Sequence, residues 1–301
     1  MFNNITIIGC GLIGSSILRA VNQKKISKKV SVFDKSNEVL SFIKKEKLSK
    51  SIFTNIKKSV EDADLVIIAT PLSSYKEILL SIKGSLKKDT ILTDTGSAKN
   101  EVNKIIKSLN LKDISWIASH PIAGTEDSGP SAGFAELFKN RWCIISASEK
   151  IRKSDVKKIE KFWEILGSKV KKMSFEEHDY ILSLTSHLPH AIAYNLVRTA
   201  ITDNAKFKQD VIQYSAGGLR DFTRIAASDP IMWRDIFVDN RKNILKVLDS
   251  FSNNLENLKE AIKNKDNEQL LKIFSATKKV RKEIIKAGQD TEKSNFGRKK
   301  N

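Results

Sequence analysis

The stretch Ile5-Thr6-Ile7-Ile8-Gly9-Cys10-Gly11-Leu12-Ile13-Gly14 decides the fold of this chain. Its first four residues predict a buried strand, its glycines fit the GxGxxG pattern, and residues 12–21 continue with helical character. A second β-rich run, residues 30–33, leads into Asp34, about 20 residues beyond the last glycine. Strand, glycine turn, helix, second strand and acidic residue in this order are typical of a βαβ unit that binds a dinucleotide.

Each residue of the turn has a physical role in this interpretation. Gly9 allows the tight turn, Gly11 lets the backbone approach a pyrophosphate, and Gly14 lets helix and strand pack closely. The pyrophosphate would lie on the free N–H groups of Leu12 and Ile13, at the helix N-terminus where the helix dipole favours negative charge.

The acidic residue after the second strand predicts NAD as the cofactor. Asp34 would accept hydrogen bonds from the adenosine ribose hydroxyls, and its carboxylate would repel the 2′-phosphate of NADP. Lys35 follows directly and argues in the opposite direction. NADP therefore stays as the less favoured alternative.

Composition limits the classes of partner. The 301 residues suit two domains, and 53 basic against 35 acidic residues give a net charge of +18. The lysines are scattered as pairs along most predicted helices instead of alternating with aromatic residues in one patch. We interpret them as solvated surface and expect no nucleic-acid partner.

Cysteine usage and hydropathy bear on the compartment. Cys10 and Cys143 are too few and too far apart for a disulfide framework or a metal cluster, and we expect both to be buried. No apolar run approaches about 18 residues, and the N-terminus enters the first strand without a basic leader. We therefore expect a cytoplasmic protein with no membrane partner.

An α/β pattern continues beyond the first βαβ unit and predicts a Rossmann-type doubly wound sheet over residues 1–173. Ligands bind outside the carboxyl ends of the strands in such sheets. The polar residues that follow three of the strands, Thr70, Ser97 and His120, are therefore expected at one edge, facing the cofactor. Strands are expected at 64–70, 90–94, 115–119, 142–146 and 169–173, with a helix over 152–166.

From Phe175 the pattern predicts helices only. Apolar stripes recur at three- and four-residue spacing from Ile244 to Ile262 and from Leu270 to Ile284, and each stripe must be buried against something. We expect an all-helical substrate and dimerisation domain over residues 174–288, forming a homodimer. Residues 289–301 are polar and basic and predict a disordered tail.

Four stretches combine turn residues with reactive side chains. His120 heads the first, residues 120–126, and at a strand end it could accept a hydroxyl proton; a histidine that is merely hydrogen-bonded in a turn is equally compatible. Ser97, in residues 95–99, offers a nearby hydroxyl or a helix cap.

The other two stretches lie in the helical half. In residues 183–191, His187 and His190 share a helix face without a carboxylate or thiol nearby, which favours hydrogen bonding over metal binding. In residues 220–233, Asp221 could hold Arg224, which could then grip a carboxylate; a surface ion pair is the alternative.

Taken together and in this order, these motifs resemble the prephenate/arogenate dehydrogenase family of tyrosine biosynthesis. The resemblance rests on GCGLIGSS, DTGSAK, HPIAGTE, SHLPHA and DFTRIAASDPIMW, and it runs from Ile5 to Ile262. The last three motifs are far more specific than the glycine pattern.

The resemblance implies a role for each matching residue. His120 is similar to the family's catalytic histidine, and Ser97 to the serine that orients it and the substrate hydroxyl. Arg224 is similar to the arginine that binds a substrate carboxylate. The resemblance further implies a second substrate-site histidine, two residues of a loop beside the pocket and an aromatic wall: His190, Thr125, Glu126 and Trp233.

The implied reaction is the oxidative decarboxylation of prephenate to 4-hydroxyphenylpyruvate with reduction of NAD. Arogenate, which differs in its side-chain amino group, is the alternative substrate. Two other readings remain open at this point. One is a different Rossmann-plus-helical dehydrogenase, of the β-hydroxyacid or pyrroline-carboxylate type, and the other is a non-catalytic protein that senses nucleotides or binds nucleic acid.

Overall fold

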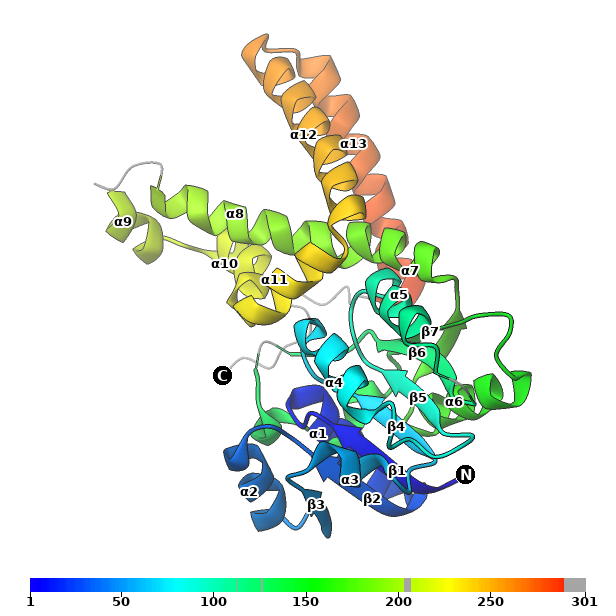
Figure 1. Ribbon diagram of the computed structural model, residues 1–301. Helices are drawn as coiled ribbons and strands as arrows, with labels where there is room; N and C mark the ends of the chain where they lie inside the picture. The colour runs from blue at the N-terminus through cyan, green and yellow to red at the C-terminus, as the bar shows by residue number, and fades with distance from the viewer. Residues whose placement is uncertain (112, 126, 203–206, 290–301) are drawn as a thin grey trace. The chain divides into compact units, whose positions relative to one another are not determined.

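The computed structural model describes residues 1–111, 113–125, 127–202 and 207–289. It divides into two compact units, Met1–Ile244 and Leu245–Asn301. The first unit holds a sheet with its covering helices and a further group of helices, and the second is helical (Figure 1). The boundary predicted at residues 173 and 174 falls inside the first unit and stays a prediction. The predicted tail from residue 290 onward lies outside the described residues.

The first unit is built on one eight-stranded sheet in the order β3-β2-β1-β4-β5-β6-β7-β8. The first six of these strands pair in parallel, β6 and β7 pair antiparallel, and β7 and β8 pair in parallel. The predicted Rossmann-type class is therefore confirmed. The strands are β1 (Phe2–Ile8), β2 (Ser27–Phe33), β3 (Ser51–Phe53), β4 (Leu65–Ile68), β5 (Ile91–Asp94), β6 (Ser115–Pro121), β7 (Trp142–Ala147) and β8 (Lys169–Lys172).

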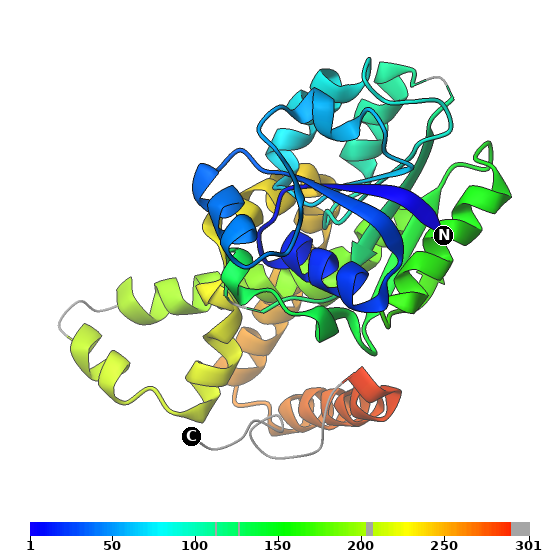
Figure 2. The same ribbon diagram turned by 90° about the horizontal axis from the view of Figure 1, so that it is seen from below.

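Helices cover both faces of this sheet (Figures 1 and 2). Alternate residues of the buried strand β4 face opposite sides: Leu65 and Ile67 belong to one apolar cluster, and Val66 and Ile68 to the other. The first cluster includes residues of α1 (Leu12–Lys24), α2 (Asn37–Lys45) and α6 (Lys153–Ile165). The second includes residues of α3 (Ile56–Val60), α4 (Tyr75–Ile82) and α5 (Asn100–Leu109). Burial on both faces explains why these strands read as continuous apolar runs.

Two features of the sheet were not predicted. The short strand β3 has no apolar run of its own to mark it, and the sequence did not reveal that β7 runs antiparallel to β6. In the part of the β6–β7 connection that the structure describes, the helical segments are two short 3₁₀ turns, η2 (Pro130–Ala132) and η3 (Ala135–Phe138). Without a crossover helix, the chain returns along the neighbouring strand in the opposite direction.

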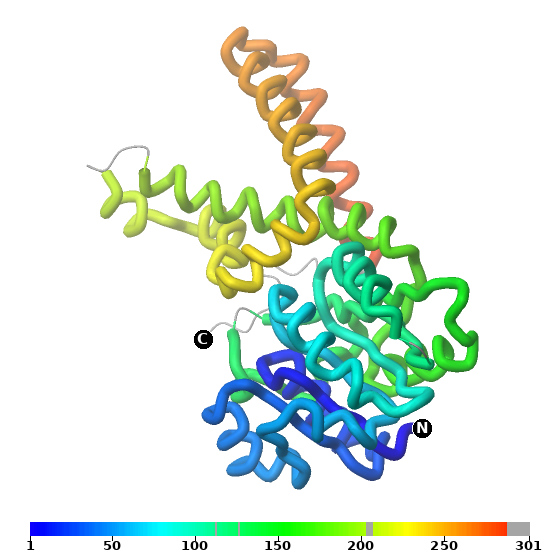
Figure 3. The backbone as a smooth tube through the Cα atoms, in the orientation of Figure 1, coloured from blue at the N-terminus to red at the C-terminus, as the bar shows by residue number. Residues whose placement is uncertain are grey.

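After β8 the described residues form helices joined by short loops and no further strand, as predicted. A capping box starts this part, because the side chain of Ser174 accepts from the backbone of Glu177 and the Glu177 side chain accepts from the backbone of Ser174. Figure 3 follows the backbone from the last strand into the long helix α8. After β8, the described helical elements of the first unit are α7 (Phe175–Leu182), η4 (Ser183–His187), α8 (Leu188–Thr202), α9 (Lys208–Gln213), α10 (Gly217–Thr223), η6 (Arg224–Ala227) and α11 (Pro230–Asp239).

The second unit contains most of α12 (Arg241–Lys263) and all of α13 (Asn267–Ile284), followed by η7 (Ile285–Gln289). The apolar stripe predicted on these helices is present but stays largely exposed: Leu255, Ile262, Phe274 and Val280 are each more than half exposed. Among the residues that the structure describes, no helix combines the length and apolar character needed to cross a lipid bilayer.

Candidate active site

The glycine turn joins β1 to α1 with very close backbone packing. Gly9 has φ +89°, and a Cβ there would collide with Thr70 and with the carbonyl of Ala69. A Cβ on Gly14 would overlap the carbonyl oxygen of Gly9. These two positions therefore need glycine for the fold itself.

Gly11 differs from its two neighbouring glycines, because a Cβ added there would meet nothing within 4 Å. It is the N-cap of α1, and no side chain among the described residues caps that helix. The backbone N–H groups of Leu12 and Ile13 therefore lie at an open helix N-terminus with room in front of Gly11. This arrangement fits a dinucleotide pyrophosphate.

Asp34 lies beside this turn at the end of β2. One carboxylate oxygen accepts the N–H of Cys10 at 2.8 Å, and the other accepts the N–H of Ser36 at 2.9 Å. The carboxylate thus shapes the glycine turn, and each of its oxygens keeps a further lone pair for a ribose hydroxyl. Cys10 is buried, as predicted, and burial raises the pKa of its thiol.

Three of the predicted residues follow neighbouring parallel strands, at the edge where these strands end. Thr70 follows β4, Ser97 follows β5, and His120 is the penultimate residue of β6. A hydrogen bond of 2.8 Å between the hydroxyls of Thr93 and Ser119 joins β5 to β6 just before this edge. The structure therefore brings these residues to the same side of the sheet as the glycine turn.

A fully buried ion pair fixes the loop after β5 to β6. The Lys99 Nζ donates to Asp94 Oδ2 at 2.6 Å and to the carbonyl oxygen of Ser119 at 2.6 Å. The other oxygen of Asp94 accepts the N–H of Ser119 at 3.0 Å. Burial lowers the pKa of Lys99, and the attraction of Asp94 opposes that shift. Lys99 and Asp94 thus both bind the backbone of Ser119, the residue that precedes His120.

His120 begins a chain of buried hydrogen bonds. Its Nδ1 lies 2.8 Å from Nε2 of His178, and Nδ1 of His178 lies 2.8 Å from Oδ1 of Asp179. The Asp179 carboxylate also accepts the backbone N–H groups of Lys99 and Asn100, at 2.8 and 2.9 Å. It therefore caps α5, a role that the sequence offered to Ser97.

Burial lowers the pKa of His120 well below its usual value, and the neighbouring His178 and Lys99 lower it further. Burial would raise the pKa of Asp179, but its hydrogen bonds, first that with His178, outweigh burial and lower it. At neutral pH the site therefore holds a neutral His120 and a charged Asp179.

The two remaining histidines, His187 and His190, both contact the ring of Trp233. The rings of His190 and Trp233 stack with centroids 3.5 Å apart, and the His187 ring meets Trp233 edge-on at 6.1 Å. Nδ1 of His187 lies 3.1 Å from Nδ2 of Asn240. Burial lowers the pKa of His187 to about 4. Burial also lowers the pKa of His190, and the positive charge of Arg224 lowers it further.

The chain contains four histidines, and the contacts connect all of them. His120 is hydrogen-bonded to His178, the Asn240 side chain donates to the Asp179 carbonyl oxygen and lies 3.1 Å from Nδ1 of His187, and the rings of His187 and His190 both contact Trp233. The structure therefore brings residues from the sheet edge and from the helical part of the first unit into one neighbourhood.

The other predicted site residues are Thr125, Asp221 and Glu126. The hydroxyl of Thr125, an exposed residue, accepts the N–H of Asp127 at 3.3 Å. Asp221 accepts from Arg220 at 3.2 Å. Glu126, predicted in the loop beside the pocket, lies outside the described residues.

Sequence reasoning missed His178, Asp179 and Lys99. Lys99 lies within the motif at residues 95–99, but nothing in the sequence around it distinguishes it from a lysine on the surface. The adjacent His178 and Asp179 sit in an ordinary capped helix. Only their long-range contacts distinguish them from surface residues of an amphipathic helix.

Comparisons with known proteins find matches to both the sheet part and the helical part of this chain. Residues 17–172 match the family model "Prephenate dehydrogenase, nucleotide-binding domain", and residues 174–276 match "Prephenate dehydrogenase, dimerization domain". The cyclohexadienyl dehydrogenase of Zymomonas mobilis is 40% identical over 93% of this chain and 96% of its own length. The prephenate dehydrogenase of Bacillus subtilis is 30% identical over 93% of this chain and 76% of its own.

A solved structure is also similar. Prephenate dehydrogenase from A. aeolicus, in complex with hydroxyphenyl propionate and NAD⁺, superimposes with a TM-score of 0.87 at 33% identity, covering 94% of this chain and 99% of that one.

The glycine turn yields a matched pair of substitutions. Gly11→Ala should leave the melting temperature nearly unchanged but weaken dinucleotide binding, because its methyl group would point into space that the protein leaves open. Gly14→Ala should lower the melting temperature, because its methyl group would meet the Gly9 carbonyl. Thermal unfolding and dinucleotide titration measure the two effects. Equal stability losses for both variants would contradict the distinction.

Proposed function

The chain belongs to the prephenate dehydrogenase family, and we propose that it catalyses the oxidative decarboxylation of prephenate with NAD as hydride acceptor. The observation that carries the proposal is the neutral, buried His120 at the sheet edge, linked through a network of buried side chains to the two histidines that contact Trp233. Family membership decides against the hydroxyacid, imino-acid and non-catalytic readings.

NAD is the cofactor that these residues support best. The open N-terminus of α1 and the space in front of Gly11 fit a pyrophosphate, and Asp34 beside the turn favours an unphosphorylated ribose. When bound, the dinucleotide supplies the acceptor for a hydride. Gly9, Gly14 and Thr70 shape the turn that would hold it.

The substrate requires one proton to be moved. As hydride leaves the carbinol carbon, the hydroxyl proton passes to His120. The ring carboxylate then leaves as carbon dioxide, and the electron pair of the broken carbon–carbon bond makes the ring aromatic. The resulting phenolate oxygen takes a proton back. Aromatisation drives the reaction, so the protein must chiefly position the ring and hold this proton.

His120 suits this role because it is neutral before the reaction. Burial, His178 and Lys99 all disfavour its charged form, so its lone pair is available over the whole physiological pH range. The rate should fall only when the pH drops through the lowered pKa of His120, because protonation removes the base.

We assign binding roles to the helical side. Arg224 would bind the side-chain carboxylate of prephenate, and His190, stacked on Trp233, would contact the substrate from the same side. Ser97 would orient the hydroxyl beside His120. Thr125 and Glu126 would belong to the loop that flanks the substrate.

The function is tested by measuring NADH formation with prephenate and with arogenate, each with NAD and with NADP. We expect turnover with prephenate and NAD, and a higher kcat/KM with NAD than with NADP, because Asp34 would repel the 2′-phosphate. If neither substrate were turned over with either cofactor, the proposal would be overturned.

The base is tested by His120→Asn. We expect kcat to fall by ~10²–10⁴, the usual contribution of a general base, while the Kd for NAD stays nearly unchanged. Steady-state kinetics and a dinucleotide titration measure the two quantities. Turnover equal to that of the unchanged protein would remove His120 from the reaction.

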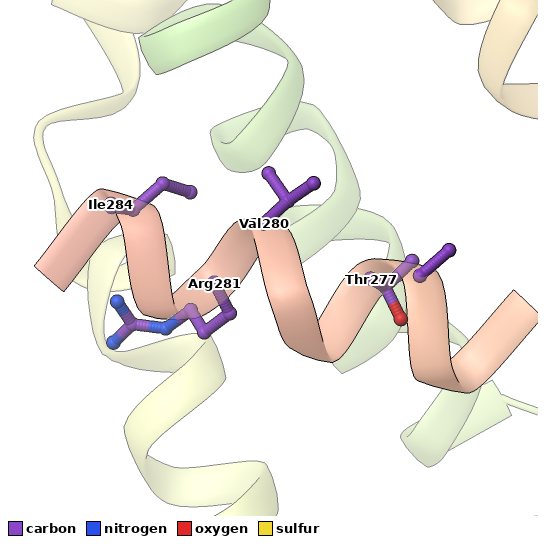
Figure 4. Close-up of a pocket in the computed structure, with 5 residues that line it drawn as sticks. Thr277, Val280, Arg281 and Ile284 are labelled. Carbon is purple, nitrogen blue, oxygen red and sulfur yellow. The ribbon is translucent and has the colours of Figure 1, made fainter.

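We propose that the protein is a homodimer. The match to a dimerization domain supports this, as do the half-exposed apolar residues of α12 and α13. A surface pocket along α13 is lined by Ala276, Thr277, Val280, Arg281 and Ile284 (Figure 4).

Sedimentation at micromolar concentration should give twice the 33.9 kDa chain mass, and Phe274→Lys should shift the population toward monomer. A monomer for the unchanged protein would contradict the proposal.

A further inference from the structure

The hydrogen-bonded chain behind His120 determines which nitrogen of its ring carries the proton. We propose that Asp179 and His178 hold His120 in the tautomer with its proton on Nδ1, so that Nε2 is free to accept the hydroxyl proton of the substrate. The inference rests on the proposed function and makes His178 and Asp179 positioning residues for it.

The argument starts at the Asp179 carboxylate, which can only accept. Its two oxygens receive the N–H groups of Lys99 and Asn100, and both groups are obligate donors. They lie at the N-terminus of α5, where the helix dipole further favours a negative charge. Asp179 is almost fully buried, yet it is compensated as a carboxylate and not as an acid.

The charge on Asp179 fixes the tautomer of His178. An ionised carboxylate offers no proton, so the 2.8 Å contact between Asp179 Oδ1 and His178 Nδ1 requires the proton on that nitrogen. A neutral imidazole carries only one N–H, which leaves Nε2 of His178 as an acceptor. Burial, reinforced by the charge of Lys99, keeps His178 neutral against the opposing attraction of Asp179.

The acceptor on His178 then fixes His120. Nε2 of His178 lies 2.8 Å from Nδ1 of His120, so Nδ1 of His120 must donate the proton of that bond. The same single-proton rule leaves Nε2 of His120 unprotonated. Asp179 thus determines which nitrogen carries the proton in both imidazole rings, and no proton has to be transferred between the rings.

The surrounding charges are consistent with neutral rings. Lys99 and His187 both disfavour a positive charge on His120, and Asp94, paired with Lys99, partly offsets the lysine for His178. The ring centroids of His120 and His178 lie 5.0 Å apart at a tilt of 57°, which suits an in-plane hydrogen bond better than a stacked pair.

Two substitutions at His178 separate a positioning role from a packing role. In His178→Gln, the side-chain oxygen can still accept from Nδ1 of His120, whereas in His178→Leu nothing can. We expect Gln to keep kcat within about tenfold and Leu to lower it by about 10- to 100-fold, part of the ~10²–10⁴ that a base contributes. KM and the Kd for NAD should change little in either variant.

A buried carboxylate elsewhere in the first unit supplies the matched control. Asp155 accepts from the Ser115 hydroxyl at 2.7 Å and from Arg152 at 2.8 Å, within α6 and β6 but with no contact to the histidines among the described residues. Asp155→Asn should lower the melting temperature without changing kcat. If loss of activity merely followed loss of stability, Asp155→Asn and His178→Leu would behave alike, and the proposal would fail.

The tautomer itself can be measured without turnover. The chain has four histidines, so long-range ¹H–¹⁵N spectra of ¹⁵N-histidine-labelled protein contain four ring systems, assigned by single substitutions. We expect the proton of His120 on Nδ1 and an unprotonated Nε2. A proton on Nε2 of His120 would overturn the inference even if prephenate is turned over, and the expected spectrum would stand even if another substrate proved correct.

Discussion

A buried carboxylate must be surrounded by donors, and this requirement on Asp179 organises the candidate site. Its oxygens bind the first amides of α5 and the ring of His178, so one charge joins the loop after β5 to the first helix of the helical part. His178 passes the constraint on to His120 at the end of β6. Removing the carboxylate would leave buried donors without acceptors on several elements at once.

The Lys99–Asp94 pair has a complementary effect on the same edge of the sheet. It fixes both backbone groups of Ser119 and so sets the position of the next residue, His120. Its lysine also disfavours a positive charge on the nearby rings. The two buried carboxylates therefore set the position of His120, whereas burial, His178 and Lys99 lower the pKa of its ring.

The parts of this site differ in how far the sequence could predict them. The glycine turn, Asp34 and the strand-end positions of Ser97 and His120 were predictable, because spacing along one βαβ unit and the rule for parallel strand ends are local. His178 and Asp179 were not, because their meaning depends on contacts with residues about 60 to 80 positions away. The antiparallel direction of β7 was not predicted for a related reason. A single sequence shows where a strand lies, but the loop that decides the direction of the strand carries no clear signal.

In the proposed reaction, His120 and Arg224 act on opposite ends of one substrate molecule. A crystal structure of the protein with NAD and 4-hydroxyphenylpyruvate tests it most directly. The account predicts the phenol oxygen within hydrogen-bond distance of Nε2 of His120 and the side-chain carboxylate paired with an Arg224 guanidinium. A product bound in the reverse orientation, or held by residues that include neither side chain, would contradict the account.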